Sequence, residues 1–190
     1  RFAAAEKALS QEDMRHRFFS AVVWELPFGS GRRWLHEGWA RLVAGGWQLS
    51  TMFSRQTGLP VTPSLSVNSA NITGGVRPDR IRDGNLPSAD RSPERWFDRT
   101  AFAVPAPFQF GNSGRNVIIA PGLVNLDTAL ARTFRLTERF NLDFRSEFFN
   151  LLNEAHLGLP NTQVDRPVGG QISSTVSPAR QMQFALKIVF

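Results

Sequence analysis

Polar and charged side chains alternate with apolar ones around residue 145, and they are the first candidates for chemistry. Asn141, Asp143, Arg145 and Glu147 occupy every second position of the segment 140–150. On a β-strand, carboxylates four positions apart lie about 13 Å apart, whereas the two carboxylates of a glycosidase lie about 5–9.5 Å apart. On a helix, the carboxylates of Asp143 and Glu147 would be adjacent. The spacing therefore predicts a charge-lined wall if the segment is a strand, and leaves acid–base chemistry open only if it is a helix.

Other residue types that support catalysis or metal binding are sparse. The chain has no Cys, and its three histidines, His16, His36 and His156, are far apart in the sequence. None of them has the spacing to a second His that a metal site uses. The sequence contains neither a Gly-x-Ser-x-Gly elbow nor a phosphate-binding loop. We therefore expect no enzyme activity, no cofactor and no metal.

The net charge of +6 comes from basic residues that are spread over the chain. A nucleic-acid-binding protein usually gathers such residues on one face or in one run, so we expect no nucleic-acid partner. Mixed charge of the kind found between residues 77 and 99 is typical of a solvated face, with contact to an acidic glycan or a lipopolysaccharide phosphate as the alternative. The charged residues of this segment are six Arg (77, 80, 82, 91, 95 and 99) with Asp79, Asp83, Asp90, Glu94 and Asp98.

Five segments show the period-2 alternation that predicts β-strands: 17–27, 47–56, 124–136, 140–150 and 180–190. The last is the clearest, because its even positions 182–190 are all apolar and its odd positions are mostly polar or small. Its length fits a transmembrane strand, which needs about 9–11 residues. No apolar run approaches the roughly 18–20 residues of a membrane-spanning helix. A membrane protein with this sequence would therefore span as a β-barrel.

The segment 140–150 also fits a helix, because Phe140, Phe144 and Phe148 recur at intervals of four, followed by Leu151 or Leu152. Its alternating neighbours and the short turn at 137–139 favour a hairpin strand instead.

The connections between the predicted strands differ in length. Leu35, Trp39, Leu42 and Val43 predict a short amphipathic helix that ends at Gly45-Gly46 and suits a membrane surface. The segments 60–121 and 154–179 are rich in turn-forming residues and predict long, poorly fixed loops. Short turns on one side and long loops on the other are typical of outer-membrane barrels. This pattern places the turn at 137–139, and the end of the last strand at Phe190, on the periplasmic side.

Several short blocks occur in a recognisable order. They are 13–18, 25–29, 45–50, 96–97 with 100–102, 110–112 with 114–116, 121–122, 125–127, 144–153 and 180–190. In this order they resemble the Oar-like TonB-dependent transporter barrels of outer membranes, and the resemblance covers nearly the whole chain from Asp13 onward. Such proteins carry a carboxypeptidase-regulatory-like domain, a plug and a barrel of about 22 strands. The chain departs from them in having no Tyr, so Phe and Trp must supply its interfacial girdles.

We therefore expect an all-β fold: an incomplete antiparallel transmembrane β-barrel segment of about five strands, with long outer loops and one short helix in a periplasmic turn. Because the sequence begins Arg1-Phe2 without an initiator Met or a signal peptide, we expect residues 1–190 to be the C-terminal portion of an outer-membrane β-barrel domain.

The resemblance implies a wall segment of a TonB-dependent transporter that imports a large nutrient (a siderophore, glycan or peptide) across the outer membrane of a Gram-negative bacterium. One alternative is a small non-transporting outer-membrane barrel or adhesin. Another is a soluble β-sheet domain that binds carbohydrate or acts as an enzyme.

Two sets of residues are candidate sites. We expect the polar faces of the strands to line the lumen, with opposite charges meeting across the hairpin: Asn125, Asp127, Asn141, Asp143, Arg145, Glu147, Gln181, Gln183 and Lys187. In the last strand, the apolar residues Phe184, Leu186, Ile188 and Phe190 are the expected assembly signal, which the barrel-assembly machinery captures by strand addition. Alternatively, Phe190 is only a lipid-facing end residue. Further expected partners are outer-membrane lipid, the plug and remaining strands of the same protein, and TonB through the region upstream.

Overall fold

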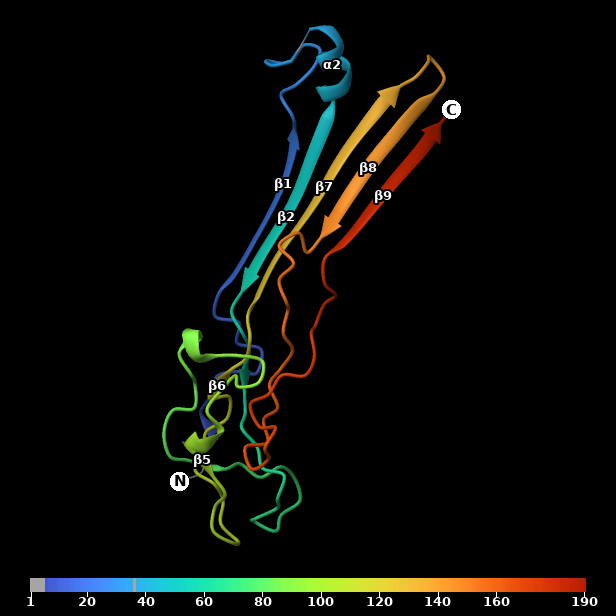
Figure 1. Ribbon diagram of the computed structural model, residues 1–190. Helices are drawn as coiled ribbons and strands as arrows, with labels where there is room; N and C mark the ends of the chain where they lie inside the picture. The colour runs from blue at the N-terminus through green and yellow to red at the C-terminus, as the bar shows by residue number, and fades with distance from the viewer. Residues whose placement is uncertain (1–5, 36) are drawn as a thin grey trace. The chain divides into compact units, whose positions relative to one another are not determined.

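The computed structural model describes residues 6–35 and 37–190 and, for residues 40 and 41, the backbone only (Figure 1). The chain forms two compact units, each built from three separate stretches. The sheet unit consists of residues 18–55, 124–155 and 178–190. The loop unit consists of residues 56–123 and 156–177 together with the described part of residues 1–17.

The sheet unit contains one five-stranded antiparallel sheet, whose strand arrows alternate in direction (Figure 1). Its strands, in spatial order, are β1 (Arg17–Glu25), β2 (Trp47–Gln56), β7 (Leu123–Arg135), β8 (Asn141–Phe149) and β9 (Gln181–Val189). All five predicted strands are confirmed, and every observed bound lies within two residues of the predicted one. The sheet is not closed, and β1 and β9 are its two edges. The expected partial barrel wall is therefore the observed architecture.

A tight turn joins β7 to β8. The Leu136 N–H donates to the Phe140 carbonyl at 3.0 Å, and the Thr137 hydroxyl oxygen accepts from the Phe140 N–H at 3.1 Å. This turn sets the register of the hairpin, with Phe134 opposite Leu142. Because β8 pairs with β7 on one side and with β9 on the other, the helical alternative for residues 140–150 is wrong.

The short helix between β1 and β2 is α2 (Gly38–Ala44). It ends at Gly45-Gly46 as predicted, and Gly46 adopts the left-handed φ of 75° that favours glycine after a helix. Leu35 lies before the helix, and His36 lies outside the described residues. Among the described residues, no helix is both long and apolar enough to cross a membrane.

The end of β8 is fixed by two asparagines in left-handed conformation, Asn150 (φ 51°) and Asn153 (φ 55°). The buried Asn150 side chain accepts from the Glu154 N–H at 3.0 Å and donates to the Glu154 carbonyl at 2.9 Å. Asn tolerates this conformation better than most residues because its short polar side chain can bond locally. The chain therefore leaves β8 through left-handed residues that are not glycines.

The loop unit consists mainly of irregular segments, but it has a hydrophobic core. Short paired strands join distant parts of it, β3 (Pro60–Val61) with β6 (Ile118–Ile119) and β4 (Asp79–Arg80) with β5 (Phe102–Ala103). Two 3₁₀ turns, η1 (Ser88–Asp90) and η2 (Arg99–Ala101), lie between them. The buried core residues are Leu65, Val76, Phe97, Ala101, Phe102, Ile118 and Val164. The expectation of poorly fixed loops is wrong, because these scattered apolar residues pack together.

Candidate functional site

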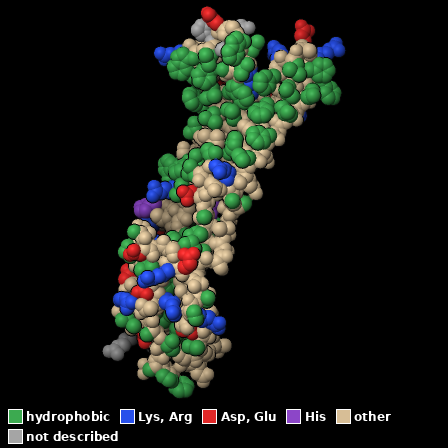
Figure 2. Space-filling model, in the orientation of Figure 1, with side chains coloured by type: hydrophobic (Ala, Val, Ile, Leu, Met, Phe, Trp, Pro, Cys, Tyr) green, Lys and Arg blue, Asp and Glu red, His purple; other side chains and the backbone are tan. Residues whose placement is uncertain are grey.

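The two faces of the sheet unit differ in chemistry, as the alternation predicted. The register places Leu186 opposite Phe144 and Phe184 opposite Ser146, so these side chains share one face. Phe148 and Phe184 contact edge to face on it, with ring centroids 6.2 Å apart. This face is not covered, because Leu186 is 69% exposed and Phe184 is 66% exposed. Hydrophobic side chains gather over the strands and α2 of this unit (Figure 2). Such an extended apolar surface is typical of contact with lipid or a partner.

The opposite face carries the charged and polar residues that we expected to line a lumen. Asp143 lies opposite Lys187 in the register between β8 and β9, and Glu147 lies opposite Gln183. The Gln183 amide donates to the Glu147 carboxylate, which also accepts from Arg145 Nε at 2.5 Å. Arg145, Glu147 and Gln183 thus form a connected polar network. Gln181 and Asn141 occupy the two ends of the segment over which β8 and β9 pair.

The predicted charge pairing across the β7–β8 hairpin is wrong. The turn at 136–140 sets a register in which Asp143, Arg145 and Glu147 face small or neutral residues of β7. These are Thr133, Ala131 and Ala129, and the Thr133 hydroxyl donates to Asp143 at 2.6 Å.

Of the predicted hairpin contacts, only Arg135 opposite Asn141 occurs. Asp127 lies beyond the paired positions, and its carboxylate accepts from the Asn150 N–H at 2.8 Å. Asn125 also lies outside the β7–β8 pairing. Residues of opposite charge instead occupy opposed positions of β8 and β9, at Asp143 and Lys187.

A hollow of about 660 Å³ lies within the sheet unit. Asp143, Arg145 and Lys187 line it together with Glu25 and Arg32, which form an ion pair with each other. The lining therefore carries both signs of charge, which suits water or a polar protein surface rather than one ionic ligand.

Arg132 interrupts the apolar face of β7, and its role could not be derived from the alternation. Its guanidinium donates to the backbone carbonyls of Leu42 and Val43, which are among the last carbonyls of α2. Helices leave their last carbonyls without partners inside the helix. The guanidinium carbon also lies 4.1 Å from the centroid of the Phe134 ring. Arg132 therefore joins α2 to the strand.

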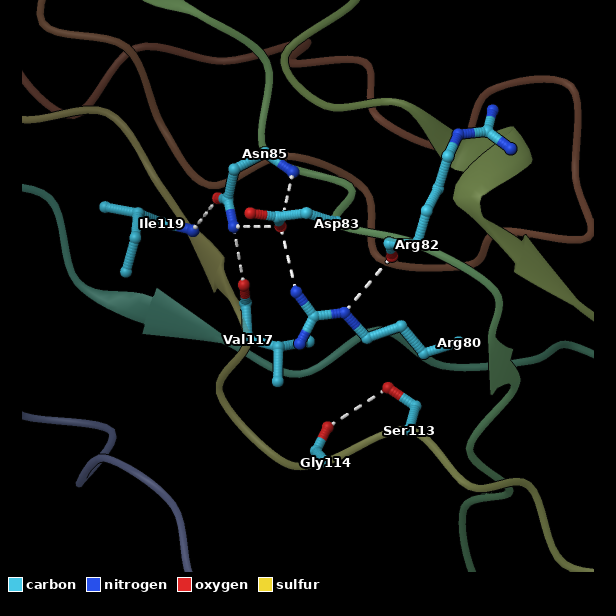
Figure 3. A network of polar contacts seen from close by, with 8 residues as sticks. All are labelled: Arg80, Arg82, Asp83, Asn85, Ser113, Gly114, Val117 and Ile119. Carbon is cyan, nitrogen blue, oxygen red and sulfur yellow. Dashed lines mark hydrogen bonds and ion pairs between the residues drawn. The ribbon is translucent and has the colours of Figure 1, made fainter.

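The loop unit contains polar side chains that replace missing strand partners. Asn85 donates to the Val117 carbonyl at 2.8 Å and accepts from the Ile119 N–H at 2.9 Å (Figure 3). Asp83 in turn accepts from the Asn85 N–H and from Arg80. The Asn85 N–H, followed by the Asn85 amide and the nearby Arg80 charge, holds the pKa of Asp83 below its ordinary value despite some burial. This network holds the loops rather than offering a free site.

A second carboxylate joins the two long loops. Asp165 accepts from the Ser66 N–H at 2.8 Å, from the Ser66 hydroxyl at 2.5 Å and from the Val67 N–H at 3.2 Å, across 99 residues of sequence in the first two cases. Partial burial raises the pKa of Asp165, but the hydrogen bonds from Ser66 and Val67 outweigh it and lower that pKa below its ordinary value of 3.8.

The arginines between residues 77 and 99 are partly engaged inside the loop unit. Arg80 pairs with Asp83 at 2.9 Å, Arg82 pairs with Asp98 at 2.7 Å, and Arg77 pairs with Glu6. These pairs support the expectation of a solvated mixed-charge surface. Two of the three histidines also lie in this unit: His156 is buried against the Ser177 hydroxyl, and the His16 N–H donates to Thr57 at 3.1 Å.

The chain was compared with protein families, curated proteins and solved structures. The family model described as outer membrane beta barrel domain matches residues 1–183. None of the curated proteins or solved structures compared with the chain matches it. The family match agrees with strands of transmembrane length whose apolar face is exposed. The chain belongs to the outer membrane β-barrel domain family and resides in the outer membrane of Gram-negative bacteria.

Proposed function

We propose that residues 1–190 are a segment of the barrel wall of a TonB-dependent transporter, which imports a large nutrient across the outer membrane. The observation that carries the proposal is the open five-stranded sheet with one apolar and one charged face. An open sheet in lipid would leave the outer edges of β1 and β9 unpaired, and such edges are not tolerated there. Further strands of the same protein therefore close the barrel.

The charged face favours a wide barrel over a small one. The interior of an eight-stranded barrel is only just wide enough for side chains to fill. The Arg145 side chain is 60% exposed and pairs with Glu147, and Lys187 and Asp143 occupy opposed positions on the same face. Such a face suits a lumen that holds water or a plug domain. A lumen of that kind favours a transporter over the alternative of a small non-transporting barrel or adhesin.

The alternative of a soluble β-domain, including a soluble enzyme, requires a buried apolar face. Leu186 and Ile188 are instead 69% and 59% exposed. The proposal assigns no catalytic role to any residue of the chain. It makes membrane lipid the neighbour of the apolar face and a plug the neighbour of the charged face, and it leaves the contact with TonB to the region upstream.

The orientation in this proposal follows from the connection lengths. The tight turn at 136–140 and the α2 connection belong to the periplasmic side in this proposal, and the long connections 60–121 and 154–179 are outer loops. β9 then ends at the periplasm. Its edge position and exposed Phe184 and Leu186 suit capture by the barrel-assembly machinery through strand addition.

The proposal is tested on the full-length protein in planar bilayers and in cross-linking with the periplasmic domain of TonB. We expect a nearly closed pore that opens when mild urea unfolds a plug, and a cross-link to TonB that depends on the upstream segment. A permanently open or absent pore, together with no cross-link to TonB, would contradict the transporter proposal while leaving the family assignment intact.

A further inference from the structure

The connection between β1 and β2 exposes large apolar side chains. In α2, Trp39 is 78% exposed, Leu42 is 63% exposed and Val43 is 60% exposed. Because these positions are three and four residues apart, they share one face of the helix. Trp34 and Leu35, just before the helix, are each about half exposed. No described residue of the sheet unit covers this patch, so it is a surface for something outside the chain.

Two contacts fix the end of α2 to the apolar face of the sheet. Trp47 Nε1 donates to the Val43 carbonyl at 2.9 Å, and Arg132 donates to the Leu42 and Val43 carbonyls. Trp47 itself packs edge to face against Phe134 and Phe144 of that face, with ring centroids 6.1 and 5.7 Å apart. The helix patch is therefore continuous with the surface that an outer-membrane barrel turns toward lipid.

The flanking charges also match a membrane surface. The Arg33 guanidinium carbon lies 5.6 Å from the centroid of the Trp34 ring. Trp is enriched at membrane–water interfaces, and Arg can keep its stem in apolar surroundings while its head group reaches water or phosphate. A lumen plug is a poorer partner for the patch, because Arg132 and Trp47 hold α2 on the other face of the sheet.

We propose that residues 33–35 and 37–43, with α2 as their centre, form a lipid anchor. The Trp39, Leu42 and Val43 face enters the boundary between head groups and acyl chains in the leaflet at the short-turn end of the barrel. Arg132 tethers this anchor to β7. A seven-residue helix is too short to be stable in water without such support. The inference rests on the membrane-barrel assignment and does not require transport.

The test uses spin labels at single cysteines. Residues 1–190 contain no Cys, and any Cys elsewhere in the full-length protein is replaced by Ser. Trp39→Cys and Val43→Cys are made in the full-length protein, labelled, and placed in vesicles of phosphatidylethanolamine and phosphatidylglycerol. Leu186→Cys is the lipid-facing reference, and Glu138→Cys, in the other short turn, is the aqueous control. The measurement is the ratio of collision rates with oxygen and with a water-soluble nickel complex.

We expect this ratio at positions 39 and 43 to be several-fold above that at position 138 and to approach that at position 186. A ratio equal to that at position 138 would place the helix in water. Labels shielded from both reagents would mean that a protein surface covers the patch. Either of these results overturns the lipid anchor.

A second measurement avoids cysteine variants that fail to assemble. Brominated phospholipids quench tryptophans that lie in the membrane, so Trp39→Phe should reduce the quenched part of the fluorescence. Trp96→Phe, a change in the loop unit, should reduce only the unquenched part. If Trp39→Phe leaves the quenched part unchanged, Trp39 does not reach lipid and the proposal is wrong.

Discussion

The sheet unit and the loop unit place their apolar side chains in opposite ways. Within the described residues, the buried apolar side chains, such as Phe97 and Ile118 at 1% exposed, lie in the loop unit. The sheet unit exposes its large apolar side chains, with Leu186 at 69%. Burial of apolar surface away from water thus stabilises the loop unit. The sheet unit depends on its hydrogen-bonded strands and on lipid that replaces water at its apolar face.

The units also satisfy their polar groups differently. In the sheet unit, strand pairing satisfies the backbone over β7, β8 and β9. In the loop unit, side chains such as Asn85 and Asp165 take over that role for irregular backbone. One chain therefore combines a fold suited to lipid with a fold suited to water. The same type of substitution should therefore affect stability differently in the two units.

The largest expected effect comes from Phe97→Ala in the loop core. Phe97 is 1% exposed and packs edge to face on Phe102, with ring centroids 6.2 Å apart. Removing such a buried ring costs about 3–5 kcal/mol. We expect faster hydrogen exchange and easier proteolysis in residues 56–123, while the barrel still assembles. Limited proteolysis and mass spectrometry of the membrane-embedded full-length protein measure both.

Phe108→Ala is the matched control, because Phe108 belongs to the same unit but is 77% exposed. It should leave proteolysis nearly unchanged. If Phe97→Ala also leaves proteolysis and hydrogen exchange unchanged, the loop core does not stabilise the unit. If it abolishes assembly of the barrel, the two units do not fold as separately as the comparison implies.

The next largest effect is expected from Leu186→Arg, near the middle of β9. A cation on the lipid face of a barrel costs about 2–4 kcal/mol at the bilayer midplane. Gln183→Arg adds the same charge to the opposite face of the same strand, where the polar network lies, and should cost much less. Urea-induced unfolding in phospholipid vesicles measures the difference. Equal losses for the two variants would mean that the sheet does not have one lipid face and one polar face.

The sequence predicts the sheet unit well because one physical signal, the period-2 alternation, recurs in each strand. It predicts the loop unit poorly. The contacts between Asp165 and Ser66 or between β3 and β6 join segments far apart in the sequence, and no local pattern marks either partner. Phe97, Phe102 and Ile118 show no shared period, so their common burial could not be derived.

Two failures in the sheet unit have local causes. The cross-hairpin charge pairs were predicted without the register, which the turn at 136–140 sets and which places Ala131 opposite Arg145. Arg132 was visible as an exception on an apolar face. Its partner was not predictable, because the carbonyls of Leu42 and Val43 belong to a helix about 90 residues earlier. The break in the alternation at Arg132 thus indicates that this residue has a structural role, but it does not show which segment Arg132 contacts.

A smaller effect is expected from Arg132→Met, which keeps apolar volume but removes the donors. The Leu42 carbonyl would lose the Arg132 donor, and the Val43 carbonyl would keep only Trp47 Nε1. An intramolecular hydrogen bond contributes about 0.5–1.5 kcal/mol to stability. Hydrogen exchange should rise in residues 38–47 and stay unchanged in the loop unit. Arg135→Met, on the other face of β7, is the control. If both variants behave alike, the tether between α2 and β7 contributes nothing.

The smallest effect is expected from the Asp165 carboxylate, and it depends on pH. Because the pKa of Asp165 is lower in the folded unit than its ordinary value of 3.8, its stabilisation is present above that value. It is lost as the pH falls through the folded pKa. Asp83 and Asp98 also have lowered pKa values and contribute in the same acid range. In the wild-type protein, the protection of the loop unit against hydrogen exchange should therefore fall at acid pH, below about pH 4.

Asp165→Asn should lower the protection against hydrogen exchange near neutral pH. It should also make that protection less dependent on pH, because the variant has no carboxylate at this position that acid can protonate. Ser66→Ala removes one donor to the same carboxylate and should give an intermediate result. Hydrogen exchange of residues 56–123, compared from about pH 7 down to about pH 2 after correction for intrinsic rates, measures this. The three proteins should converge at the acid end, where the wild-type carboxylate is protonated. A constant difference at every pH would show that Asp165 acts through packing rather than through its charge.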